Sequence, residues 1–282
     1  MKKTYYFSLV LILILSIPSC ITMRKSDNRI IRKFKKEGLQ AQVKTFDFEA
    51  KQLRYVLSKT FDKDLITIIF IHGAPGSNSD YEDYLTDKDL NKRANLISVD
   101  RLGYGYSDFG NSQTSIMKQA QSIEKLMSSL GTSNFIVVGW SFGGPIAGQI
   151  ALNISEKVDH LIMLAPALSP NHERFFRAGK LAQHNISRWM VPTPFIMAQE
   201  EKMEHVKELK RLEKLWPTLK VPITYLHGSD DELVPYDGNI NFALSAFNDS
   251  LLTTKTIDGS GHIFPMTNME VVKQVIMEIL DE

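Results

Sequence analysis

The stretch from Phe135 to Ile154 reads FIVVGWSFGGPIAGQIALNI and decides the fold. Its first four residues are an apolar run typical of a buried strand, and from Pro145 onward the pattern is that of a helix with proline in its first turn. Between them lies a Gly-x-Ser-x-Gly sequence centred on Ser141. A serine on so sharp a strand-to-helix turn has a strained backbone, and larger side chains two positions away would clash. The placement predicts that Ser141 is a nucleophile rather than a structural serine.

The same alternation of strands and helices continues along the chain from residue 43. Short runs rich in Ile and Val predict buried strands of a parallel sheet, and the first two segments alternate as a half-exposed hairpin would. The expected strands are 43–48, 53–57, 65–71, 95–99, 135–139, 158–164, 221–226 and 251–257. The pattern predicts one doubly wound α/β domain over residues 41–282, with a mostly parallel eight-stranded sheet and right-handed crossovers.

One region, residues 167–220, interrupts this alternation. It contains no convincing strand, but it has helix-like polar segments, several prolines and scattered aromatic residues. Because a structureless loop of that length is uncommon inside a compact domain, we expect an inserted helical lid. Within it, Glu200, Glu201 and Glu204 would suit a substrate amine, but their spacing favours the solvated face of a helix.

The predicted nucleophile needs a base and a third group that orients the base, because a serine hydroxyl is a weak nucleophile at neutral pH. Six of the seven histidines lie at strand ends, at the start of a core strand or in the insertion. His262 remains, on a glycine-rich loop between the last strand and the last helix. We therefore predict that His262 is the general base.

The orienting acid is expected after the strand 221–226, where Asp230, Asp231 and Glu232 follow one another. Asp231 is the preferred candidate and Asp230 the second. Glu232 is third because its side chain should point into the following helical turn. The alternative is that all three carboxylates form a capped, solvated turn.

Composition sets limits on the class of protein. The chain has 282 residues, with 33 Lys and Arg against 32 Asp and Glu, and 43% of its residues are hydrophobic. Such a chain can bury a core, which excludes disorder for the bulk of it. A net charge of +1 without a basic stripe argues against nucleic acid as a partner. A single cysteine excludes an internal disulfide, an iron–sulfur cluster and a cysteine-based zinc site.

The amino terminus has the pattern of an export signal. Residues 1–19 begin with lysines and continue with an apolar run too short to cross a bilayer, which favours a signal peptide. The run ends in Ile-Pro-Ser-Cys, which resembles the lipobox of bacterial lipoproteins, with Cys20 as the residue that would carry the lipid. The alternatives are an ordinary signal peptide with a chance cysteine and an uncleaved anchor.

We expect an exported lipoprotein of the cell envelope, anchored to the membrane through Cys20. Residues 20–40 are rich in Lys and Arg and are expected to form a basic tether. Such a tether would lie on anionic headgroups or act as a solvated spacer that holds the domain away from the membrane.

These motifs together resemble the α/β-hydrolase superfamily, and the resemblance extends from residue 43 to the C-terminus apart from the insertion. The order Ser141, Asp231, His262 along the chain is the order in that fold. The resemblance implies that these three residues form a catalytic triad.

Two further motifs support the same resemblance. Residues 70–76 (FIHGAPG) look like the His-Gly-x-Pro-Gly loop after the third strand of that family. The resemblance implies an oxyanion hole made by the backbone amides of Ala74 and Phe142. Residues 100–107 (DRLGYGYS) look like a turn after the fourth strand that is structural in the family.

The resemblance implies a serine hydrolase of the carboxylesterase type, which would cleave a small-molecule ester, thioester or amide by acyl transfer. Haloalkane dehalogenases and related epoxide hydrolases have Asp in place of Ser141, so their chemistry is not expected. Proline iminopeptidases share the lidded layout and the His-Gly-x-Pro-Gly loop, which leaves an aminopeptidase as an alternative. A lipid-anchored binding module without turnover is the alternative from another class. No metal or organic cofactor is implied, and residues 103–107 lack the spacing of a dinucleotide-binding loop.

Overall fold

The computed structural model describes residues 22–175, 179–183 and 187–282. Its centre is one eight-stranded sheet with the strand order β1-β2-β4-β3-β5-β6-β7-β8. The strands β1 and β2 pair antiparallel, β2 joins β4 antiparallel, and the pairs from β4 through β8 are parallel. The strands are β1 Gln42–Phe48, β2 Lys51–Leu57, β3 Ile66–Ile71, β4 Ala94–Val99, β5 Phe135–Trp140, β6 Val158–Leu164, β7 Ile223–Gly228 and β8 Leu252–Ile257. The predicted fold class and the predicted eight strands are therefore confirmed.

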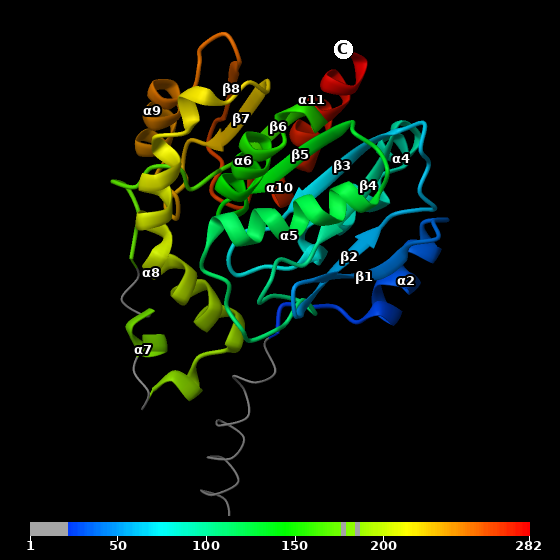
Figure 1. Ribbon diagram of the computed structural model, residues 1–282, viewed down its shortest axis with the longest axis horizontal. Coiled ribbons are helices and arrows are strands. Elements are labelled where there is room, and N and C mark those ends of the chain that lie inside the picture. The colour runs from blue at the N-terminus through cyan, green and yellow to red at the C-terminus, as the bar shows by residue number, and fades with distance from the viewer. Residues whose placement is uncertain (1–21, 176–178, 184–186) are drawn as a thin grey trace, which may run out of the picture.

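Helices cover both faces of the sheet (Figure 1). The α-helices of the described residues are α2 Asp27–Lys36, α3 Glu82–Thr86, α4 Lys88–Arg93, α5 Ile116–Ser129, α6 Gly143–Asn153, α7 Gly179–Gln183, α8 Thr193–Glu213, α9 Tyr236–Ala246, α10 Phe264–Thr267 and α11 Met269–Asp281. One apolar cluster joins a face of the sheet to α5, α6, α9 and the end of α8. A second cluster joins the other face to α2, α3, α4 and α11. The strands between them are buried on both sides, as their continuous apolar runs require.

The helix α5 shows how local sequence sets an element. The Ser115 side chain caps its amino terminus by accepting a hydrogen bond from the amide of Lys118. The apolar side chains Ile116, Ile123 and Leu126 recur at helical spacing and are fully buried in the first cluster.

The insertion between β6 and β7 is helical over much of its described length. It contains α7, the 3-10 helix Arg188–Met190, the long helix α8 and the 3-10 helix Trp216–Thr218. The carboxyl half of α8 packs on the core through Leu209 and Leu212, which are fully buried. The insertion is thus joined to the domain at its carboxyl end.

The structure corrects the expectation that residues 20–40 form a basic tether, because many of them belong to a packed helix. The predicted signal peptide and Cys20 lie outside the described residues, but Asp27–Lys36 form the helix α2. Its side chains Ile30 and Phe34 are fully buried against the sheet. Since burial of two large apolar side chains favours the docked state by a few kcal/mol, about 1.5–3 for each, this part of the segment belongs to the folded domain and is not a solvated spacer.

Within the part of the chain that the structure describes, none of the helices is both long enough and apolar enough to cross a bilayer.

Candidate active site

Ser141 sits on the tight turn between β5 and α6. Its φ angle is +56°, in the left-handed region that non-glycine residues rarely adopt, and its amide donates to the Leu164 carbonyl at 2.9 Å. A Cβ atom on Gly139 would lie 2.3 Å from the carbonyl oxygen of Gly143, and one on Gly143 would lie 2.3 Å from that of Ile71. Both flanking glycines are therefore required by the close approach of β3, β5 and α6.

The carboxylate of Asp231 follows β7 and faces the loop that carries His262. The Asp231 Oδ2 atom lies 2.7 Å from the His262 Nδ1 atom, and Oδ1 accepts from the amides of Leu233 and Val234, each at 2.9 Å. Burial would raise the pKa of Asp231, but hydrogen bonds from His227 and His262 outweigh it and hold that pKa well below its usual range. Asp231 is therefore ionised at neutral pH and orients the imidazole of His262.

The two neighbouring carboxylates do not take part in this contact. Asp230 is exposed, and its side chain accepts from the Ser229 hydroxyl at 2.8 Å. Glu232 is also exposed. Among the three adjacent acids, the structure thus brings Asp231 to His262.

A second histidine, His227, also binds this carboxylate, although its place at a strand end predicts no part in the site. Its Nε2 atom lies 2.9 Å from Asp231 Oδ2 and 3.0 Å from the carbonyl oxygen of Val234. Since both are acceptors, Nε2 carries the hydrogen, and Nδ1 accepts from the Tyr225 hydroxyl at 2.6 Å. His227 is fully buried and contacts the same carboxylate oxygen as His262, so it helps to fix the position of the Asp231 carboxylate. Strand alternation along β7 places Tyr225 and His227 on one face, but nothing in the sequence pairs them with Asp231.

Ser141 and His262 both line one cavity of about 680 Å³. The same cavity is lined by Ala74 and Phe142, the two residues whose amides are the expected oxyanion donors. The indole Nε1 of Trp140 donates to the carbonyl oxygen of His262 at 3.1 Å and thereby ties its loop to β5. The structure therefore gathers the predicted nucleophile, base and oxyanion donors around one space of the size that small-molecule sites have.

Most of the cavity wall is apolar. Around the serine, the apolar lining comes from the loop after β3, the end of β5 and the start of α6: Ala74, Pro75, Trp140 and Phe142. The other apolar side chains come from the amino-terminal segment, the insertion and the loops after β7 and β8: Met23, Ala167, Leu181, Ala182, Met190, Val191, Pro192, Phe195, Ala198, Leu233, Val234 and Ile263. Such a wall excludes water and suits an acyl chain, because hydrocarbon gains most from leaving water.

One polar cluster interrupts this wall, and no motif in the sequence predicts it. His205 stacks on the Phe142 ring with 4.3 Å between ring centroids, and its Nδ1 atom lies 3.1 Å from the Glu173 carboxylate. Lys202 forms an ion pair with the same carboxylate. Burial would raise the pKa of Glu173, but His205 and Lys202 lower it to about 2. Helical spacing puts Lys202 and His205 on one face of α8, whereas their partner lies far away in the sequence.

The glutamates of α8 correct an expectation. The spacing predicts a solvated helix face for Glu201, but this residue is fully buried and forms a two-pronged ion pair with Arg101, with contacts of 2.7 and 3.1 Å. The Tyr104 hydroxyl donates to the same carboxylate at 2.6 Å. Glu200 pairs with Arg188 at 2.6 Å. Glu201 therefore fastens α8 to the domain and does not present a carboxylate to a substrate amine.

Arg101 carries this connection to the loop expected to supply the oxyanion hole. Its Nε atom donates to the carbonyl oxygen of His72 and its Nη2 atom to that of Gly73, both at 2.9 Å. These two residues directly precede Ala74. Arg101 is fully buried, so helix α8 and the loop before Ala74 are held by one side chain.

Comparisons with known proteins agree with this architecture. Residues 66–184 match the sequence profile of the alpha/beta hydrolase fold. A probable 1-acylglycerol-3-phosphate O-acyltransferase of Oryza sativa subsp. japonica is 31% identical over 134 residues, which are 45% of this chain and 32% of the rice protein. The chain thus spans about a third of the length of that relative.

Two solved structures resemble the whole domain. A membrane phospholipase A described as a bacterial virulence factor superposes with a TM-score of 0.69 at 17% identity, over 99% of this chain and 98% of the other. The carboxylesterase CesB of Bacillus subtilis superposes with a TM-score of 0.66 at 14% identity, over 90% and 97%. Together with the sheet order, these similarities show that the chain has the α/β-hydrolase fold.

Proposed function

We propose that this protein is a serine hydrolase that cleaves carboxylic esters through an acyl-enzyme intermediate. The observation that carries the proposal is the Asp231–His262 contact beside a cavity that also contains Ser141 on its strained turn. The rice, phospholipase and carboxylesterase relatives all have names that denote action on acyl esters, which supports the same class of reaction.

The mechanism follows from the roles of these groups. The Ser141 hydroxyl attacks the substrate carbonyl while the His262 imidazole takes its proton. Asp231 holds the hydrogen of the imidazole on Nδ1, which leaves Nε2 free to accept that proton. The amides of Ala74 and Phe142 stabilise the oxyanion, where the loss of one donor typically costs about 10²–10³ in rate. The leaving alcohol takes the proton from His262, and water then releases the acyl group in the reverse sequence.

The competing functions make different demands on the site. An aminopeptidase needs an acidic group for the substrate amine. The candidate glutamates Glu200 and Glu201 are held in ion pairs with arginines, and Glu204 forms an exposed ion pair with Lys207. Among the described residues that line the cavity, the one acid is Glu173, and it is held by His205 and Lys202. An apolar wall with a neutralised acid favours an ester of an apolar acyl group over a peptide amine.

A binding module without turnover would have no need for the strained serine and its partners. A fluorophosphonate probe separates the two functions, because it reacts with an activated serine. We expect the full chain to label and Ser141→Ala to remain unlabelled. The absence of label on the folded wild-type protein would refute an active nucleophile.

Substrate class is tested with p-nitrophenyl esters from acetate to palmitate and with aminoacyl-β-naphthylamides. Cleavage of the esters by the wild type, and its loss in Ser141→Ala, is the expected result. Cleavage of the amides instead would move the assignment to an aminopeptidase.

We also propose that the chain is exported and attached to a membrane through a lipid on Cys20. The support is the sequence before that residue, a basic start and a short apolar run that ends in Ile-Pro-Ser-Cys.

A further inference from the structure

The mouth of the cavity is surrounded by apolar side chains that remain exposed. Six apolar residues line the cavity and also keep more than a third of their surface accessible to solvent. Exposed apolar side chains that gather on one surface usually mark an interaction site. These residues, which we call the apolar rim, are Met23 (39% exposed), Leu181 (49%), Met190 (53%), Phe195 (44%), Leu233 (46%) and Ile263 (55%). Trp189, next to Met190, is 53% exposed as well.

One member of the rim, Met23, lies close to the proposed membrane attachment in the sequence. Cys20 precedes it by three residues, which span at most about 11 Å of extended chain. An uncleaved apolar anchor ending near residue 17 would leave Met23 within about 21 Å of the anchor. Either form of attachment therefore keeps the cavity mouth close to the lipid surface.

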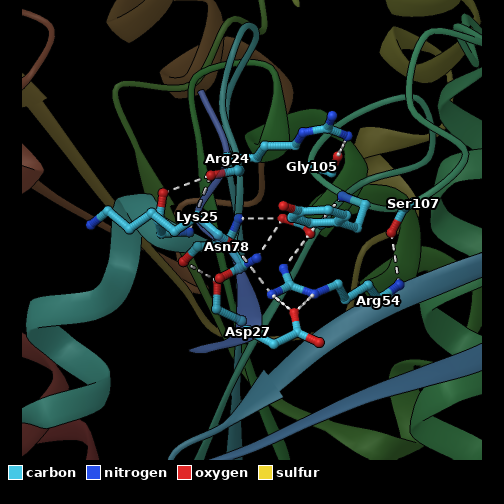
Figure 2. A network of polar contacts seen from close by, with 12 residues as sticks. Arg24, Lys25, Asp27, Arg54, Asn78, Gly105 and Ser107 are labelled. Carbon is cyan, nitrogen blue, oxygen red and sulfur yellow. Dashed lines mark hydrogen bonds and ion pairs between the residues drawn. The ribbon is translucent and has the colours of Figure 1, made fainter. Parts of the chain in front are cut away.

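Contacts after Met23 fix the direction in which the chain leaves the domain (Figure 2). The guanidinium of Arg24 stacks on the rings of Tyr106 and Phe109, 4.6 and 4.3 Å from their centroids, and donates to the Gly105 carbonyl at 3.3 Å. Lys25 forms an ion pair with Glu82, whose side chain is buried.

A second group of contacts continues this clamp into the core. Asp27 accepts from Arg54 at 2.7 Å, and Arg54 also donates to the buried carboxylate of Asp100 at 2.8 Å. The Arg54 guanidinium, itself nearly inaccessible, links the amino-terminal segment to the turn that follows β4 (Figure 2). Since α2 begins at Asp27 and packs on the sheet, residues 24–36 belong to the domain and hold Met23 at the mouth.

We propose that the apolar rim docks on a lipid bilayer, so that the acyl substrate enters the cavity from the membrane rather than from water. This inference rests on the proposed function and on the proposed amino-terminal attachment. The clamp matters because a flexible tether would leave the domain free to rotate, whereas a fixed segment beside the mouth turns the mouth toward the lipid. An indole beside the rim suits the boundary between headgroups and hydrocarbon. The substrates of this site are then the acyl lipids of that membrane.

The test uses tryptophan fluorescence in vesicles whose phosphatidylcholine carries bromine on its acyl chains. Trp216 is fully buried in the domain, and Trp140 is buried at the inner wall of the cavity, where only an acyl chain that has entered the cavity would reach it. Trp189 is therefore the tryptophan that a docked rim would place in reach of bromine in the bilayer. The full chain with Ser141→Ala is reconstituted in these vesicles, so that no lipid is consumed. Docking predicts that about a third of the emission is quenched, relative to unbrominated vesicles, because Trp189 is one of the three tryptophans, and that a larger share is quenched where an acyl chain in the cavity also reaches Trp140.

Two leucines provide a matched pair of variants in the same background. Leu181 on the rim and Leu244 on α9 are 49% and 50% exposed, and both lie on helices. We expect Leu181→Asp to lower the quenching at least twofold and Leu244→Asp to leave it unchanged, with equal thermal unfolding of the two variants as the control for folding.

Three results would overturn the proposal. The first is no quenching in protein that remains bound to the vesicles. The second is an equal loss of quenching in both variants. The third is a dimer in solution whose interface protects the methionines of the rim, Met23 and Met190, from chemical oxidation. Because the protein in these experiments lacks the Ser141 hydroxyl, none of these results bears on the proposed ester hydrolysis, which the labelling experiment tests separately.

Discussion

Removal of the Glu201 carboxylate should destabilise the whole domain, although this residue lies in the insertion. In Glu201→Ala the guanidinium of Arg101 stays fully buried and loses both of its ion-pair contacts. The hydroxyl of Tyr104 and the amide of Gln119 lose the same acceptor. A buried charge that loses its partner typically costs about 3–5 kcal/mol, since the charge can no longer be compensated and water cannot replace the carboxylate fully.

The expected magnitude is large enough to be measured by two methods. For a domain of this size each kcal/mol lowers Tm by about 2–4 °C, so Glu201→Ala should unfold on the order of 10 °C below the wild type. Urea unfolding should show a lower midpoint with an unchanged slope. Glu201→Gln keeps the shape and one acceptor, and its stability should fall between those of the alanine variant and the wild type.

Glu204→Ala on the same helix is the matched control. Glu204 forms an ion pair with Lys207 at 3.6 Å, and both side chains are largely exposed. Such a pair contributes little, so the control should differ from the wild type by less than about 0.5 kcal/mol. If the two alanine variants unfold at the same temperature, the ion pair of Arg101 does not fasten α8 to the domain, and the reasoning is wrong.

Three further predictions concern the acid, the polar cluster and the lipid. Asp231→Asn should lower kcat for ester cleavage by about 10⁴ while unfolding remains cooperative, whereas Asp230→Asn should stay near the wild type; equal losses would contradict the assignment. The pKa of Glu173 is lowered to about 2 in the folded protein. The ionised side chain therefore contributes its full stabilisation of the folded state above the pKa of the unfolded chain, about 4.3, and this contribution is lost as pH falls toward 2. The stability advantage of the wild type over Glu173→Gln should therefore shrink by about 3 kcal/mol across that window, measured by urea unfolding. Labelled palmitate should enter the wild type in cells but not Cys20→Ala, and label in that variant would exclude the cysteine as the attachment site.

Much of the fold could be predicted from the sequence because it is carried by local patterns. Parallel strands buried on both faces read as continuous apolar runs, and each of the eight expected segments is a strand in the structure. Strand β7 begins at Ile223, two residues later than expected, because Pro222 has no amide hydrogen to donate to the neighbouring strand. Sequence patterns locate elements well and their ends less well.

The amino-terminal segment shows where composition misleads. Its abundance of Lys and Arg predicted a tether, but Ile30 and Phe34, four residues apart, form an apolar stripe that packs on the sheet. A short stripe among charges is a weak signal, and whether it is buried depends on a free patch of sheet elsewhere in the fold.

The residues of the candidate site also fall into two groups, those that the sequence predicts and those that it does not. Ser141 and His262 stand at points that the order of strands and loops dictates, so the sequence could single them out. Glu173 and Glu201 are held by partners far away in the chain, and no periodicity connects such groups. His227 lies only four positions before Asp231, but a strand and the turn after it separate the two, so no regular spacing pairs them either. What decided their roles is burial, because a buried charge must find a partner wherever the fold brings one.

Few side chains connect the expected reacting groups with the apolar cavity wall that would select the substrate. The expected reacting groups stand at the carboxyl end of the sheet, whereas the amino-terminal segment and the insertion supply most of the apolar wall. Arg101 contacts both parts, since it holds the carbonyl groups before Ala74 and the carboxylate of Glu201 on α8. A displacement of α8 that breaks this ion pair would therefore reach, through Arg101, the loop that is expected to supply an oxyanion donor. Changes on the exposed rim avoid that connection, so the wall can vary in sequence without moving the proposed catalytic groups.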